Sequence, residues 1–182
     1  MILAMREPFH TETTHRGRLL TVEVLSFADK QGRPVQREVV RHPGAVVIVP
    51  VLAGGGLVLI RNQRVAVDAA LWELPAGTLE PGEEPASAAR RELEEETGYR
   101  PARVRRLGAF FTSPGFLNEL LHAFVAEDLA FVGQRLEPGE EIEARELPRG
   151  EVLAMVSDGR IRDAKTIAAV LMWDRLPGGP AA

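Results

Sequence analysis

The sequence predicts an α/β fold, in which a mixed sheet carries helices on its faces and follows a small N-terminal antiparallel β hairpin. Residues 19–27 and 34–40 are rich in apolar and β-branched residues, as strands are. Residues 45–52 form a continuous apolar run, and residues 85–97 carry a strong helix pattern. The 182 residues are enough for one domain, or for a domain with a small appendage.

The predicted hairpin lies near the N-terminal end of the sequence, over residues 19–40. Asp29-Lys30-Gln31-Gly32 reads as the turn between its two strands. We therefore divide the chain into an N-terminal β segment, residues 1–42, and a main domain, residues 43–182. An isolated hairpin is marginally stable in water, so this segment is expected to need a packing partner.

The apolar run 45–52 suits a strand that is buried on both faces. Gly54-Gly55-Gly56 then reverses the chain into a second such strand over residues 57–60. Three glycines also suit a phosphate-binding loop, but no Gly-Lys-Ser/Thr follows them, so the turn is the better interpretation.

The helix over residues 85–97 has Pro85 at its first position and Gly98 just past its end. Ala86, Ala89 and Leu93 form a stripe that can pack on the sheet. Further strands are predicted over residues 104–111 and 120–126, and further helices over residues 150–156 and 163–176, with Asp163 as a cap.

Composition excludes several classes of function. The net charge of −4 and the pI of about 5.7 indicate no general attraction to nucleic acid. The absence of cysteine excludes disulfides, thiolate nucleophiles and cysteine-bound zinc, and fits a reducing compartment. Residues 1–5 are apolar, but Arg6, Glu7 and Pro8 end that run, so we expect no signal peptide, no membrane span and a cytoplasmic location.

Three glutamates of the predicted helix share one face. Glu92, Glu95 and Glu96 stand at i, i+3 and i+4, where like charges repel by about 0.2–0.5 kcal/mol per pair. A hard divalent cation such as Mg²⁺ or Mn²⁺ would remove this repulsion. The alternative is a solvated acidic face with Arg90–Glu94 and Arg91–Glu95 ion pairs, and helix spacing alone does not decide between the two.

The residues around this helix decide between a cation site and a solvated acidic face. Gly77 is followed after five residues by Glu83, and after seven more by Arg91-Glu92-Leu93-x-Glu95-Glu96-x-Gly98. This resembles the Nudix box, G-x5-E-x7-R-E-U-x-E-E-x-G-U, where U is a bulky apolar residue. The one soft departure is Tyr99, where the family usually has an aliphatic residue. The resemblance implies an α/β/α sandwich and hydrolysis of a diphosphate bridge.

The resemblance also implies a set of metal ligands. Glu92 and Glu96 would be the principal ligands of Mg²⁺, for which Mn²⁺ can substitute, with Glu95 close by or acting through water. The backbone carbonyl of Ala76 would be a further ligand. Arg91 would orient a glutamate, and Glu83 would be a structural partner in the loop.

Pro114 stands sixteen residues after Gly98 and looks like the mark of the ADP-ribose pyrophosphatase subgroup, although alone it reads as a Pro-Gly turn. Arg61-Asn62-Gln63-Arg64 and the lead-in Trp72 to Gly77 are also similar to that subgroup. The resemblance implies a small nucleoside diphosphate substrate, ADP-ribose, cut to AMP and ribose 5-phosphate; FAD or a nucleotide sugar is the alternative, and a non-catalytic nucleotide sensor a remote one. The predicted substrate-binding residues are Arg61, Arg64, Glu73, Ser113, Pro114, Gly115 and Glu119.

Two further expectations complete the prediction. Glutamates engaged with metal are poor proton acceptors, so the catalytic base should lie in the acidic segment 136–143; Glu140 is favoured, with Glu137 and Glu141 as rivals. In the resembling enzymes the N-terminal segment packs across a two-fold axis and contributes to the partner's substrate site, with Glu73 near the interface. We therefore expect a homodimer.

Overall fold

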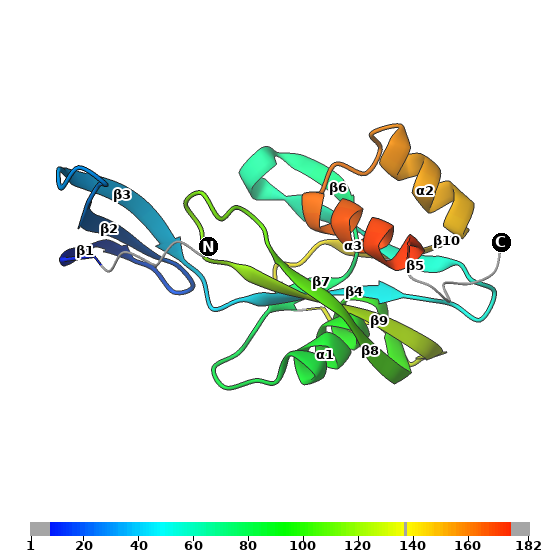
Figure 1. Cartoon of the computed structure of the whole chain (residues 1–182). Helices are drawn as coiled ribbons and strands as arrows, with labels where there is room; N and C mark the ends of the chain where they lie inside the picture. The colour runs from blue at the N-terminus through cyan, green and yellow to red at the C-terminus, as the bar shows by residue number, and fades with distance from the viewer. Residues whose placement is uncertain (1–7, 137, 176–182) are drawn as a thin grey trace. The chain divides into compact units, whose positions relative to one another are not determined.

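The computed structural model describes residues 8–136 and 138–175 (Figure 1). Their contacts group them into two compact units. The first holds residues up to 44 together with residues 111–120, and the second holds residues 45–110 and those from 121 onward. Residues 1–5, Arg6, Glu7, Glu137 and the last residue of the predicted helix 163–176 lie outside the described residues.

The first unit is a three-stranded antiparallel sheet in the order β1-β2-β3. Its strands are β1 (His10–Arg16), β2 (Thr21–Ala28) and β3 (Pro34–Arg41). The predicted turn joins β2 to β3: Gly32 has a φ of +79° and donates its N–H to the Asp29 carbonyl at 3.1 Å. The sequence predicts only two of these strands. Strand β1 contains no apolar residue and is exposed throughout, so it has no alternation of apolar and polar residues from which it could be predicted.

The second unit contains a four-stranded mixed sheet in the order β7-β4-β9-β8 and a three-stranded sheet in the order β10-β5-β6. In the first, β4 pairs in parallel with β9 and antiparallel with β7. The strands are β4 (Ala45–Pro50), β5 (Leu57–Arg64), β6 (Ala69–Glu73), β7 (Ala76–Thr78), β8 (Tyr99–Phe111), β9 (Leu120–Phe131) and β10 (Ile142–Leu147). The helices are α1 (Pro85–Thr97), α2 (Arg149–Ser157) and α3 (Ala164–Asp174), with a short 3-10 turn, Val65–Val67.

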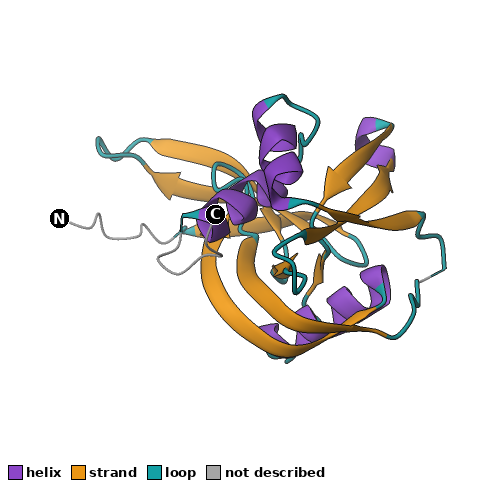
Figure 2. Cartoon of the chain, turned by 90° about the vertical axis from the view of Figure 1, so that its right-hand side faces the viewer, coloured by secondary structure: helices purple, strands orange, loops and turns teal. Residues whose placement is uncertain are grey.

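Strand β4 contributes side chains to two hydrophobic clusters, because successive side chains of a strand point to opposite faces. Val46 and Ile48 pack in a cluster that contains Leu93 of α1. Val47 and Val49 pack in a separate cluster that contains residues of α2 and α3. Figures 1 and 2 show these helices on the two sides of the strands. The α/β/α sandwich is thereby confirmed, and the uninterrupted apolar run follows from burial on both faces.

Several boundaries differ from the prediction. Strand β5 continues to Arg64, so Arg61 and Arg64 lie within a strand and not after it. Strands β6, β7 and β10 were not predicted. The predicted stripe of α1 is wrong at Ala86, which is exposed; Ala88, Ala89 and Leu93 are the apolar residues that α1 buries. Among the described residues, no helix combines the length and the apolar character that a membrane crossing needs.

Candidate functional site

The helix that carries the glutamates begins and ends where the sequence predicts. Pro85 occupies the first turn, and Gly98 closes the helix with a φ of +76° and an N–H bond to the Glu94 carbonyl at 2.9 Å. Gly98 is also required by space. A Cβ there would lie 2.7 Å from the backbone nitrogen of Gln134.

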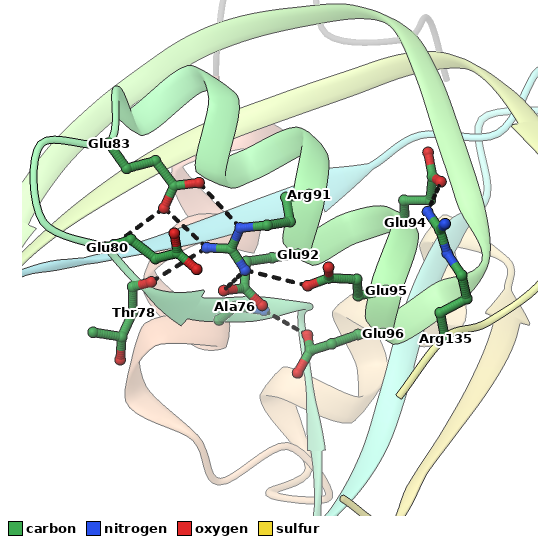
Figure 3. Close-up of polar contacts among 10 residues, drawn as sticks. All are labelled: Ala76, Thr78, Glu80, Glu83, Arg91, Glu92, Glu94, Glu95, Glu96 and Arg135. Carbon is green, nitrogen blue, oxygen red and sulfur yellow. Dashed lines mark hydrogen bonds and ion pairs between the residues drawn. The ribbon is translucent and has the colours of Figure 1, made fainter. Parts of the chain in front are cut away.

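Arg91 is the centre of the polar contacts on this helix (Figure 3). Its guanidinium donates to Glu83 at 3.0 and 2.9 Å, to Glu92 at 2.7 Å and to Glu95 at 3.2 Å. The hydrogen bond from Arg91 lowers the pKa of Glu83 below its ordinary value. Arg91 therefore ties the loop before the helix to two carboxylates on the helix. The other ion pair of the solvated alternative does not form, because Arg90 donates to the Pro101 carbonyl.

Glu92 and Glu96 converge on the start of β7. The Glu96 side chain is 4% exposed and accepts a hydrogen bond from the Ala76 N–H at 2.8 Å. The Glu92 carboxylate lies so close to Gly77 that a Cβ at Gly77 would stand 1.9 Å from the Glu92 Cδ. Gly77 thus leaves the room that this carboxylate occupies.

The surroundings of Glu92 and Glu96 disfavour the ionised form of both side chains. Burial, together with the charges of Glu92 and Glu140, raises the pKa of Glu96 to about 8 despite the hydrogen bond from the Ala76 N–H. Burial also raises the pKa of Glu92 against the opposing effect of Arg91. The effect of Glu140 on both groups shows that the acidic segment is close enough for its charge to act on them.

These residues fit a divalent cation in their chemistry. Glu96 is a buried carboxylate and Glu92 is a half-buried one. They lie on one helix face and form a hard oxygen donor set whose mutual repulsion a cation relieves. In the described parts of the chain no three acidic or histidine side chains are gathered around one point, and Arg91 engages both Glu92 and Glu95.

The segment that follows β9 lies against the end of α1. The Arg135 N–H donates to the Glu95 carbonyl at 3.0 Å, and the Val132 N–H donates to the Gly98 carbonyl at 2.7 Å. The Gln134 amide donates to the Glu96 carbonyl. These bonds use carbonyls that a helix end leaves without intrahelical partners. They bring the chain leading to Glu140 beside the helix that carries the glutamates.

The predicted substrate-binding residues of the second unit have partners of their own. Arg64 donates two hydrogen bonds of 2.7 Å to Glu73, which is 1% exposed. Arg61 lies over the Trp72 ring at 5.9 Å and lines an open cavity of about 330 Å³ together with Glu141. Glu73 therefore has cationic partners within its own chain, and direct contact of Arg64 or Glu73 with substrate stays a prediction.

The other predicted substrate-binding residues belong to the first unit. Ser113 closes a turn by accepting bonds from the N–H groups of Phe116 and Leu117 at 3.2 and 2.9 Å. This turn contains Pro114 and Gly115. Glu119 accepts a hydrogen bond from the Thr112 hydroxyl at 2.6 Å. Their role in binding likewise stays a prediction.

Sequence reasoning missed two polar residues of α3, Lys165 and Thr166. Lys165 contacts Glu73, and the Thr166 hydroxyl accepts the Leu74 N–H at 2.8 Å. Each pair is separated by 92 residues. The only local signal was Asp163, which caps α3 as predicted.

Known proteins resemble this chain in sequence and in fold. The family model described as NUDIX domain matches residues 40–170. The ADP-ribose pyrophosphatase of Bacillus subtilis (strain 168) is 37% identical over 161 residues, which cover 87% of this chain and 87% of that protein. The methanol dehydrogenase activator of Bacillus methanolicus is 38% identical over 162 residues, 88% of each chain. The solved crystal structure of an ADP compounds hydrolase has a TM-score of 0.80 at 26% identity and covers 93% of this chain and 92% of that chain.

Proposed function

The chain belongs to the Nudix family, and from that premise we propose that it hydrolyses ADP-ribose to AMP and ribose 5-phosphate with Mg²⁺ as cofactor. It is a Nudix hydrolase that acts on nucleoside diphosphate derivatives and uses a divalent metal ion. The observation that carries the proposal is the convergence of Glu92 and Glu96 on Ala76 and Gly77 at the start of an intact box. The similarity to an ADP-ribose pyrophosphatase over most of the chain supports the substrate.

The roles of the residues follow from their positions. Glu92, Glu96 and the Ala76 carbonyl hold the cation, with Glu95 beside them. When bound, Mg²⁺ neutralises the diphosphate and lowers the pKa of the attacking water. Arg91 keeps Glu92 and Glu95 from turning freely, because it binds both while it is anchored on Glu83. Water attacks one phosphorus, and the P–O bond of the bridge breaks.

Glu140 is our choice for the group that removes the proton from water. Its charge raises the pKa of both Glu92 and Glu96, which supports a position near the cation. Glu141 is the rival on the described part of the segment, and it lines the same open cavity as Arg61. Arg61 and Arg64 are proposed to contact the substrate, since a guanidinium presents several donors in one plane to phosphate oxygens.

The proposal is tested by a panel of substrates with Mg²⁺, with products separated by chromatography. The panel contains ADP-ribose, FAD, a nucleotide sugar, a dinucleoside polyphosphate and a nucleoside triphosphate. We expect ADP-ribose to have the highest kcat/KM. A higher value for FAD or the nucleotide sugar would move the assignment within the diphosphate class, and a triphosphate preference would reject the subgroup. Binding of nucleotides without turnover of any of them would indicate a sensor.

We also propose a homodimer in which the N-terminal sheet packs against a second copy. Support comes from the exposed apolar side chains of this unit, including Phe9, Leu19 and Phe116. Three strands with little buried apolar surface need a further packing surface. Sedimentation at micromolar concentration is the measurement, and a fully active monomer would contradict the proposal.

A further inference from the structure

A group of polar residues at the start of α3 contacts the strand that leads into the box. We call Asp163, Lys165 and Thr166 the α3 cluster; it contacts Glu73 and Leu74. None of the three residues belongs to the box, and the mechanism above does not use them. All of their contacts lie within the second unit.

One set of contacts of the α3 cluster surrounds Glu73. Its carboxylate is 1% exposed, and both the Arg64 guanidinium and the Lys165 ammonium contact its Oε2 atom. Lys165 also pairs with Asp163 at 3.0 Å. Burial alone would raise the pKa of Glu73, but Arg64 and Lys165 hold it below its ordinary value. Two cations thus keep a buried carboxylate charged at the end of β6.

A second set of contacts of the α3 cluster holds the backbone of Leu74. Thr166 is fully buried, and its hydroxyl accepts the Leu74 N–H at 2.8 Å while it donates to the Asp163 carboxylate at 2.6 Å. A single hydroxyl thus satisfies one buried donor and one carboxylate oxygen. Among the described residues, no buried side-chain nitrogen or oxygen lacks a partner.

The fixed amide lies two residues before the site. Leu74 is followed by Pro75, whose carbonyl accepts the Ile48 N–H of β4 at 3.0 Å, and then by Ala76, whose N–H binds Glu96 at 2.8 Å. A continuous series of bonds therefore runs from the Asp163 carboxylate through Thr166 and the residue 74–76 backbone to Glu96. A shift of the Leu74 amide moves the Ala76 peptide, and with it the partner of Glu96.

We propose that Asp163, Lys165 and Thr166 are positioning residues, which fix the backbone at Glu73 and Leu74 so that Ala76 and Gly77 present Glu96 and Glu92 to the divalent cation. This inference rests on the proposed function, because it assumes that those carboxylates bind the metal. Partners that orient ligands from outside the coordination shell commonly change metal affinity or activity by about 10–100-fold when they are removed.

The test compares Thr166→Val with Thr166→Ser. Valine keeps the shape of threonine and removes the hydroxyl, whereas serine keeps the hydroxyl. Val170→Ala is the matched control, because Val170 lies on the same helix, is fully buried and has only an apolar side chain. For each full-length variant the affinity for Mn²⁺ is measured by electron paramagnetic resonance of the free ion, together with kcat and the thermal midpoint, at a temperature where all variants are folded.

We expect Thr166→Val to weaken Mn²⁺ binding and to lower kcat by about tenfold or more. Thr166→Ser should restore both, and Val170→Ala should lower the thermal midpoint while leaving Mn²⁺ affinity unchanged. If Thr166→Val does not fold, Lys165→Met gives the same comparison. Wild-type Mn²⁺ affinity and kcat in the valine variant would overturn the inference and leave the proposed function intact, as would equal losses in Val170→Ala. A wild-type protein that binds no Mn²⁺ would refute the proposed function itself.

Discussion

Gly77 offers a way to move one carboxylate without touching it. Its φ is not positive, so alanine is compatible with the backbone. The added Cβ would lie 1.9 Å from the Glu92 Cδ and 2.0 and 2.3 Å from the two carboxylate oxygens. Since carbon atoms in contact are about 3.5 Å apart, the carboxylate has to retreat by about 1.5 Å.

This displacement sets the expected size of the effect. A misplacement of about 1 Å in a catalytic site can cost about 100-fold in rate, so Gly77→Ala should lower kcat by about 100-fold or more. Stability should respond much less. The obstructing atoms are the end of a flexible side chain, and alanine in place of a compatible glycine stabilises by about 0.4–1 kcal/mol through the unfolded state. The free energy of unfolding should therefore change by less than about 1 kcal/mol.

The assay measures kcat at saturating Mg²⁺ and unfolding in urea without metal. Gly98→Ala is the matched control: its Cβ would meet backbone atoms, Gln134 N at 2.7 Å and Gly133 C at 2.8 Å, and Gly98 has a φ of +76°. It should lose stability as well as activity. Normal kcat in Gly77→Ala would refute the placement of Glu92 as a ligand. Destabilisation equal to that of Gly98→Ala would show that the backbone, and not the Glu92 carboxylate, is what alanine strains.

Three further predictions follow from the site. Glu96→Gln replaces a buried carboxyl group whose pKa is raised to about 8, so that its ionised form is disfavoured without metal. The metal-free protein should therefore keep or gain thermal stability, while turnover with Mg²⁺ falls by orders of magnitude. A fully active variant, or wild-type turnover in excess EDTA, argues against the metal site. Glu140→Gln should lower kcat strongly with little change in KM, because the base acts in the transition state; if Glu141→Gln or Glu137→Gln has this effect instead, the segment is right and the residue is wrong. Glu73 has its pKa lowered from 4.5, so its ionised form stabilises the fold above that pH and this contribution is lost as the pH falls through the lower folded-state value. The difference in thermal midpoint between wild type and Glu73→Gln should therefore shrink in acid, and a difference independent of pH would contradict this.

Sequence patterns predicted the helices and strands in which the pattern of neighbouring residues along the chain reflects their burial. The apolar run around Ile48 and the helix bounded by Pro85 and Gly98 are of this kind. Strand β1 has no buried residue, and β7 has three residues, so neither carries a readable period.

The same limit applies to the candidate site. The box could be read because its glutamates share one helix, whereas the contact of Thr166 with Leu74 joins residues 92 apart. Nothing near Thr166 in the sequence indicates that its hydroxyl accepts that amide. Similarly, the pairing of Glu73 with Arg64 and Lys165 depends on where β5, β6 and α3 meet, and composition does not reveal it.

The contact between the end of α1 and the segment after β9 has a consequence for hydrogen exchange. The amide hydrogens of Val132, Gly133 and Arg135 are held by carbonyls of Gly98 and Glu95, so they exchange with solvent only when that end of the helix opens. The last helical turn and residues 132–135 therefore form one cooperative unit of local unfolding. In most helices, fraying is confined to the terminal turn. Here, opening of the last turn of α1, which carries Glu95 and Glu96, would at the same time release residues 132–135.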